Sequence, residues 1–127
     1  MVAAVADFTP KFPQSGKLKK SMLGESWQIE LEQTTDILSN INKEGLKTVA
    51  FKAEMDTEEG LKNAQNLLSQ KKVDAVCYNL LKDATSFGGD ENEITFITPK
   101  EQIALGRVGK LKLAEKIITH AKALSHD

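Results

Sequence analysis

The sequence predicts an α/β fold in which helices flank a mostly parallel sheet. Apolar runs rich in small and β-branched residues recur along the 127 residues, and segments with helical spacing of apolar residues lie between them. Strands that alternate with helices imply a parallel sheet with crossover connections. Ligands of such sheets bind beyond the carboxyl ends of the strands.

The first third of the chain surrounds a lysine-rich loop. Met1–Asp7 is an almost continuous apolar run, which predicts a strand buried on both faces. The polar stretch 8–21 is expected to be a loop, and the alternation over 27–31 predicts a half-buried strand. Thr34 or Thr35 is expected to cap a short helix. The apolar stripe of that helix is Ile37, Leu38 and Ile41.

The middle of the chain has clearer signals. Residues 47–54 and 73–78 are predicted to be buried strands. Asp56 and Glu59 have the spacing of a capping box at the start of a helix between these strands. The apolar side of that helix is Leu61, Ala64, Leu67 and Leu68.

The last third is predicted to be richer in strand. A loop over 80–92 leads to a strand at 93–98, which is expected near an edge of the sheet. No element is predicted over 99–110, and a helix is predicted at 110–124. Because an apolar strand that starts at the first residue lacks a preceding turn, we expect a truncated domain. The expected fold is Rossmann-like over residues 1–127, with a sheet incomplete at its N-terminal side and a β-rich C-terminal part.

Composition excludes several classes of protein. The formal net charge is −1, which argues against a protein that binds polyanions or membrane surfaces. Apolar runs stay far below the roughly 20 residues of a membrane span, and the N-terminus lacks the basic flank of a signal peptide. A single cysteine, Cys77, fits a reducing cytoplasm, and with two histidines it offers no structural zinc site.

Three polar features lie where a ligand of this fold is expected to bind. The segment 16–20 carries Lys17, Lys19 and Lys20, which fits either a mobile phosphate-binding loop or a solvated surface loop. Asp7 ends a strand and could contact a ribose or a Mg²⁺ ion, or simply cap the next turn. Residues 34–36 open a helix, where they could receive an anion or only cap the helix. Strand ends at 54–56 and at Asn79 with its loop complete the predicted edge.

These features follow one another in the order of a known family. The quoted segments are Ala3-Ala4-Val5-Ala6-Asp7-Phe8, Gly16-Lys17-Leu18-Lys19-Lys20, Thr35-Asp36-Ile37-Leu38, Phe51-Lys52-Ala53-Glu54, Val73-Asp74-Ala75-Val76-Cys77-Tyr78-Asn79 and Phe87-Gly88-Gly89-Asp90-Glu91-Asn92-Glu93. Together they resemble the phosphopantothenate–cysteine ligase part of the bacterial bifunctional flavoproteins of coenzyme A synthesis, over almost the whole chain.

The resemblance implies a reaction and a set of site residues. The ligase uses CTP and Mg²⁺: the substrate carboxylate forms an acyl-cytidylate, and the amine of cysteine then displaces CMP. By position, Lys17 is the catalytic loop lysine that neutralises phosphate charge. The residues implied to bind the nucleotide are Asp7, Lys17, Thr35, Asp36, Ile37, Leu38, Phe51 and Lys71. The metal ligands stay open among Asp7, Asp36, Glu54 and Asp90.

The chain departs from the family pattern in several places. Leu67 stands where the family has a second nucleotide-contacting lysine, and Lys52 could supply the missing charge. The family's Asn-Asp pair is replaced by Asn79-Leu80. The Gly-rich ligase segment and the decarboxylase domain that binds FMN match nothing in the chain. We therefore expect a chain inactive alone, whose substrates in the complete enzyme are phosphopantothenate and cysteine, with no nucleic-acid or membrane partner.

Two other interpretations stay open. The chain could be a non-catalytic module that dimerises or completes the site of a partner, or part of a different nucleotide-binding α/β protein such as an NAD-dependent dehydrogenase. Because an apolar strand edge at residues 1–7 would invite pairing with another chain, we expect a homodimer or a larger assembly.

Overall fold

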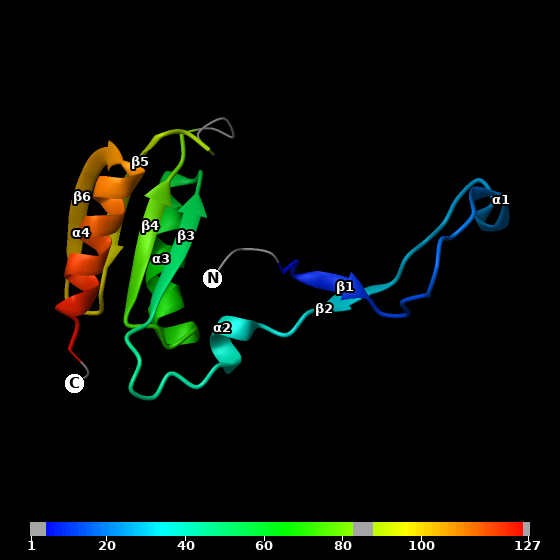
Figure 1. The fold of residues 1–127 in the computed structure, drawn as a ribbon, viewed down its shortest axis with the longest axis horizontal. Helices are drawn as coiled ribbons and strands as arrows, with labels where there is room; N and C mark the ends of the chain where they lie inside the picture. The colour runs from blue at the N-terminus through cyan, green and yellow to red at the C-terminus, as the bar shows by residue number, and fades with distance from the viewer. Residues whose placement is uncertain (1–4, 83–87, 126–127) are drawn as a thin grey trace. The chain divides into compact units, whose positions relative to one another are not determined.

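The computed structural model describes residues 5–82 and 88–125 of the chain, which divides into two compact units, Met1–Asn40 and Ile41–Asp127 (Figure 1). Each unit has its own sheet. The first sheet contains two strands and the second contains four. Within the described residues, no helix is both long enough and apolar enough to cross a bilayer.

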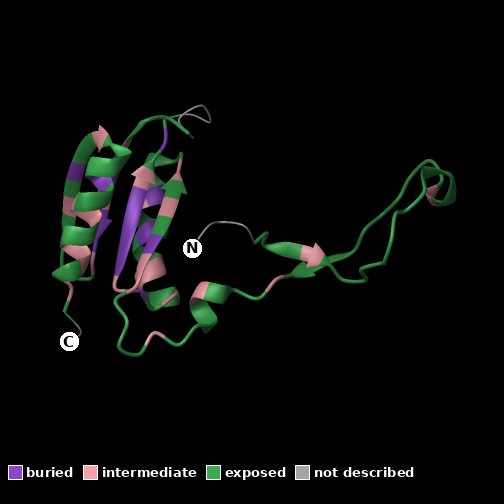
Figure 2. Cartoon of the chain, viewed as in Figure 1, coloured by how far each residue is buried: buried purple, intermediate pink, exposed green. Residues whose placement is uncertain are grey.

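The first unit is a long hairpin followed by a short helix. Strand β1 (Phe8–Pro10) pairs antiparallel with β2 (Leu31–Gln33), α1 (Lys20–Leu23) lies between them in the chain, and α2 (Ile37–Asn40) follows. None of residues 5–40 is buried (Figure 2). Residues 5–40 are therefore held by hydrogen bonds across the hairpin and form no buried core of their own.

The hairpin corrects two predictions. The strand predicted at residues 1–7 lies partly outside the described residues, and Val5–Asp7 are not in a strand. Pairing starts instead at Phe8, in the predicted loop. The strand predicted at 27–31 contributes only Leu31, because the ladder continues toward Gln33. The alternating apolar residues that suggested a half-buried strand are exposed, as Trp27 is at 53%.

The second unit is a four-stranded sheet with one helix against each face. Its sheet order is β3 (Val49–Glu54), β4 (Ala75–Leu80), β5 (Glu91–Ile97) and β6 (Gln102–Gly109). Helix α3 (Thr57–Gln70) connects the parallel pair β3 and β4, and α4 (Lys110–Lys122) follows β6. Helix α3 contacts β3 and β4, whereas α4 contacts β5 and β6. The α/β class is thus confirmed, together with the β-rich C-terminal part.

The strand pairing is more mixed than predicted. Three strands share one direction, but β5 runs against both of its neighbours, so only the pair β3 and β4 is parallel. Strand β5 was expected near an edge and is an inner strand. The edge is β6, which lies where no element was predicted.

A β-bulge explains why β6 escaped prediction. The core-facing residues are Ile103, Leu105 and Val108, so their spacing changes from two to three. At this point the register with β5 shifts, and Gly106 has a φ of +80°, a backbone conformation that favours glycine. The extra residue interrupts the period of two by which a strand is identified in a sequence.

The core lies on both sides of β4. Cys77 and Phe96 face α4, where they pack with Leu113. Val76 and Tyr78, which alternate with Cys77 along β4, face α3. This packing buries β4 on both faces, as its apolar sequence predicted.

Candidate functional site

The backbone of Asp7 is fixed beside the turn that precedes α2. The carbonyl oxygen of Asp7 accepts a hydrogen bond from the amide of Thr34 at 2.9 Å. The Thr34 hydroxyl also donates to the carbonyl oxygen of Ala6 at 2.6 Å. These bonds extend the ladder in which Phe8 pairs with Gln33. The first unit therefore brings Asp7 close to the segment that begins at Thr35.

Asp36 organises the start of α2. Its carboxylate accepts hydrogen bonds from the Ser39 amide at 3.2 Å and from the Ser39 hydroxyl at 2.8 Å. The helix was predicted to be capped by Thr34 or Thr35; Asp36 has this role because its carboxylate reaches the amide three residues further on. Ile37 and Leu38 form the first turn of the helix, and Ile37 is 41% exposed.

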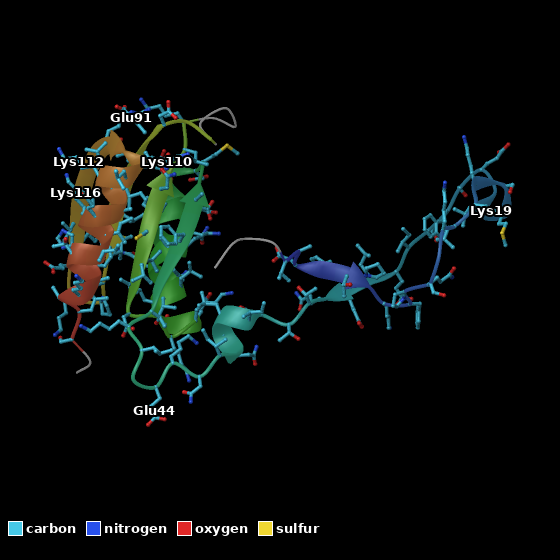
Figure 3. The ribbon with its side chains drawn as sticks, in the orientation of Figure 1. Lys19, Glu44, Glu91, Lys110, Lys112 and Lys116 are labelled. Carbon is cyan, nitrogen blue, oxygen red and sulfur yellow. The ribbon has the colours of Figure 1, made fainter. Side chains whose placement is uncertain are left out.

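Lys17 lies in the exposed loop between β1 and α1. Its neighbour Gly16 has a φ of +82°, so the loop turns sharply just before the lysine. A cavity of about 480 Å³ in this unit is lined by Gly16 and Leu18, the residues on either side of Lys17. Lys19 is exposed at the start of α1 (Figure 3). The ammonium groups of this loop are thus accessible to a ligand.

The second unit holds the other two predicted nucleotide contacts on opposite sides of its sheet. Phe51 is 69% exposed on β3 and lines an apolar groove of about 300 Å³ along α4. Lys71 follows α3, which packs on the other face, and its amide donates to the carbonyl oxygen of Leu67 at 2.9 Å. These two residues are not brought together.

Lys52 does not present a free ammonium group. Its Nζ lies 3.0 Å from Glu54 Oε1, and both residues belong to β3. The carboxylate of Glu54 partly neutralises the charge that Lys52 was expected to supply in place of Leu67.

The cysteine of the second unit is chemically inert. Cys77 is fully buried in β4, and burial raises the pKa of its thiol to about 12. A thiol that stays protonated at neutral pH is a poor nucleophile. Cys77 is therefore a core residue of the second unit.

Metal ligands were left open by the sequence. Within residues 5–82 and 88–125, no group of three or more histidine, cysteine or acidic side chains could hold a metal ion. Asp7, Asp36, Glu54 and Asp90 therefore belong to no such group in the described part of the chain.

A polar cavity lies at one end of the four-stranded sheet. It lies where β4 ends and where β5 begins, and Asn79 and Arg107 are among its lining residues. The strand end at Asn79 was predicted as a ligand position. Arg107 was not singled out in the sequence. Its orientation depends on the β-bulge in β6, and the only local sign of this bulge is Gly106.

An open α/β sheet with a polar cavity at a strand end is the architecture of a small-ligand-binding α/β domain. Residues 1–124 match the family described as DNA/pantothenate metabolism flavoprotein C-terminal domain. The chain belongs to this family.

Similar proteins agree with this assignment. The chain is 37% identical over 107 residues to a cysteine/cysteine sulfinic acid decarboxylase from an unknown prokaryotic organism, with 81% of the chain and 29% of the relative covered. It is 31% identical over 125 residues to the Coenzyme A biosynthesis bifunctional protein CoaBC of Bacillus subtilis, with 97% of the chain and 30% of the relative covered. The chain thus spans less than a third of these curated relatives.

A solved structure supports the fold over both units. The crystal structure of the C-terminal domain of a Coenzyme A biosynthesis bifunctional protein CoaBC matches with a TM-score of 0.62 and 26% identity. The match covers 95% of this chain and 52% of that domain.

Proposed function

We propose that this chain supplies the CTP-binding part of a phosphopantothenate–cysteine ligase in coenzyme A synthesis. The observation that carries the proposal is the family match over residues 1–124, together with relatives named as coenzyme A biosynthesis proteins. The placement of Asp7 beside residues 34–36 supports it, because two segments far apart in the sequence then offer polar groups to one ligand.

The reaction has two steps in which charge must be stabilised. A carboxylate oxygen of phosphopantothenate attacks the α-phosphorus of CTP, and pyrophosphate leaves. The amine of cysteine then attacks the acyl carbon, loses a proton and displaces CMP. Lys17 neutralises phosphate charge that grows during the first step. Asp7 and the segment 35–38 hold the nucleoside, so that the α-phosphorus stays in reach of the carboxylate. Mg²⁺ enters as the counter-ion of the triphosphate.

The test is nucleotide binding by this chain. Thermal unfolding is followed with CTP, ATP or NAD, each with Mg²⁺. A ligand at about 100 times its Kd stabilises the native state by about 2.7 kcal/mol, so CTP is expected to raise the Tm measurably. A Tm shift by NAD and none by CTP would favour a dehydrogenase and contradict the proposal.

A matched pair of lysine variants tests the role of the loop. Lys17→Ala is expected to weaken CTP binding about tenfold, the effect of losing one charge-assisted contact, and to leave cytidine binding unchanged. Lys19→Ala removes a neighbouring ammonium group and controls for the general charge of the loop. Equal losses in both variants would show that only the overall charge of the loop matters.

A second role, self-association, is favoured by the first unit. Phe12, Trp27 and Leu31 are each more than half exposed, and residues 5–40 include none that is buried. Exposed apolar side chains in and near a two-stranded sheet are stabilised when another surface covers them. We propose that a second copy of the chain does so in a homodimer. Light scattering after size exclusion is expected to give the dimer mass, and Trp27→Glu to give the monomer. A monomer at high concentration for the unchanged chain would rule this out.

A further inference from the structure

The polar cavity at the end of the four-stranded sheet carries charges of both signs. Its volume is about 340 Å³. Its charged lining residues are Lys82, Asp90, Glu91, Glu93 and Arg107. Glu91 lies at the end of the sheet where β4 stops (Figure 3). All of these residues belong to the second unit.

The strand register places a carboxylate and a guanidinium group side by side. Glu93 on β5 pairs directly with Arg107 on β6, so both side chains point to the same face of the sheet. This is the face opposite α4, because Ile94 and Val108, the next residues along each strand, pack in the core under α4. The bulge at Gly106 sets this orientation.

Glu91 contacts the guanidinium group of Arg107 through Nε. Arg107 Nε lies 3.5 Å from Glu91 Oε2, and the two side chains stay 56% and 59% exposed. A contact through Nε leaves the terminal nitrogens of the guanidinium group free to bind a carboxylate in the planar geometry that arginine favours. Glu93 has no such ion pair among those found in the described residues.

The mixture of charges selects one chemical class of ligand. Three carboxylates and two cationic side chains line the cavity, so its net charge is negative and disfavours a triphosphate by like-charge repulsion. The described acidic residues form no cluster that could hold a metal ion. A small molecule with one ammonium and one carboxylate group matches both charges. We propose that the cavity binds an α-amino acid as its zwitterion, with the carboxylate on Arg107 and the ammonium group on Glu93.

The identity of the amino acid rests on the proposed function. In the ligase reaction the amine of cysteine is the second nucleophile, so cysteine is the amino acid that we expect to bind. Leu80 and Leu81 offer an apolar wall for a short side chain. This wall has no group specific for a thiol, so alanine is expected to bind with similar affinity to cysteine.

Titration of the whole chain followed by amide NMR tests the subsite. L-cysteine under reducing conditions and L-alanine are expected to shift the amide signals around Glu93 and Arg107 saturably. Arg107→Gln is expected to weaken L-cysteine binding about tenfold or more and to leave cysteamine, which lacks the carboxylate, unchanged. Glu93→Gln is expected to weaken both. Glu91→Gln controls for the lost ion pair, because it leaves the guanidinium group in place.

The outcomes separate the two proposals. Saturable shifts that survive Arg107→Gln, or no saturable shifts with any amino acid, would overturn the subsite. The dispersion of the amide spectrum shows whether each variant is folded. CTP binding is measured on the same samples: CTP binding without amino-acid binding leaves the ligase proposal and removes the subsite. Amino-acid binding without CTP binding keeps the zwitterion site and contradicts its assignment to the ligase reaction.

Discussion

The close contact between Gly60 and Tyr78 decides whether Gly60→Ala raises or lowers the free energy of unfolding. In an exposed helix, Gly→Ala stabilises by about 1 kcal/mol because alanine loses less backbone entropy. In α3, however, a Cβ on Gly60 would lie 2.6 Å from the Tyr78 hydroxyl oxygen and 2.9 Å from Glu54 Cβ. Overpacking of this kind costs about 1 to 3 kcal/mol. We therefore expect Gly60→Ala to lower the free energy of unfolding by up to about 2 kcal/mol.

Removing the Tyr78 hydroxyl tests the same contact from the side of the sheet. It is buried, and it is the one described buried side-chain oxygen or nitrogen found without a hydrogen-bond partner. Removing an unpaired buried hydroxyl relieves a desolvation cost of about 1 kcal/mol or more. Tyr78→Phe is thus expected to be neutral or stabilising, and Tyr78→Phe with Gly60→Ala to recover part of the lost stability.

Urea unfolding followed by circular dichroism gives the four free energies of this double-mutant cycle. Asn66→Ala on the exposed side of α3 is the control for helix propensity, and it is expected to stabilise slightly. If Gly60→Ala were stabilising by about 1 kcal/mol, as at an open helical position, the packing of α3 against Tyr78 would be refuted.

Three further predictions concern the second unit. Asp74→Ala is expected to cost about 1.5 to 3 kcal/mol in urea unfolding, because the Asp74 carboxylate accepts from the Thr48 amide at 2.6 Å and from its hydroxyl at 3.1 Å; Asp74→Asn should cost less. Asp56→Ala removes the cap that accepts from two amides of α3 and is expected to cost about 1 kcal/mol. Because the pKa of Cys77 is raised from 9.0 to about 12, the folded state retains this proton, so stability is unaffected below pH 9.0 and falls as the pH rises toward 12. Urea midpoints across this range should decline less in Cys77→Ala, and an equal decline would contradict the assignment.

The sequence predicted the elements that carry their own pattern and missed those that depend on distant partners. Helix α3 was predicted from the cap at Asp56 and the apolar spacing that follows it, and β4 from a continuous apolar run. These signals are local. By contrast, β1 pairs with residues more than twenty positions away and has no apolar alternation, so only its partner strand defines it.

The candidate site residues were predicted from the family resemblance rather than from local patterns. The resemblance supplied Asp7 and Asp36, and the hydrogen bond from Thr34 to Asp7 gives these positions a shared environment in the first unit. Arg107 could not be found in this way. Its direction is set by the bulge and by the register of β6 against β5, and both are tertiary features.

The two units differ in how far their residues are buried. Within residues 5–82 and 88–125, the buried residues all lie in the second unit, whereas Asp7 and Lys17 belong to the first. Because the cost of a substitution scales with burial, changes at Asp7 or Lys17 are expected to alter CTP binding with little effect on the unfolding of the second unit. Core changes such as Phe96→Ala should do the reverse, costing about 3 to 5 kcal/mol. A loss of core stability in Lys17→Ala would mean that the hairpin is part of the folding unit.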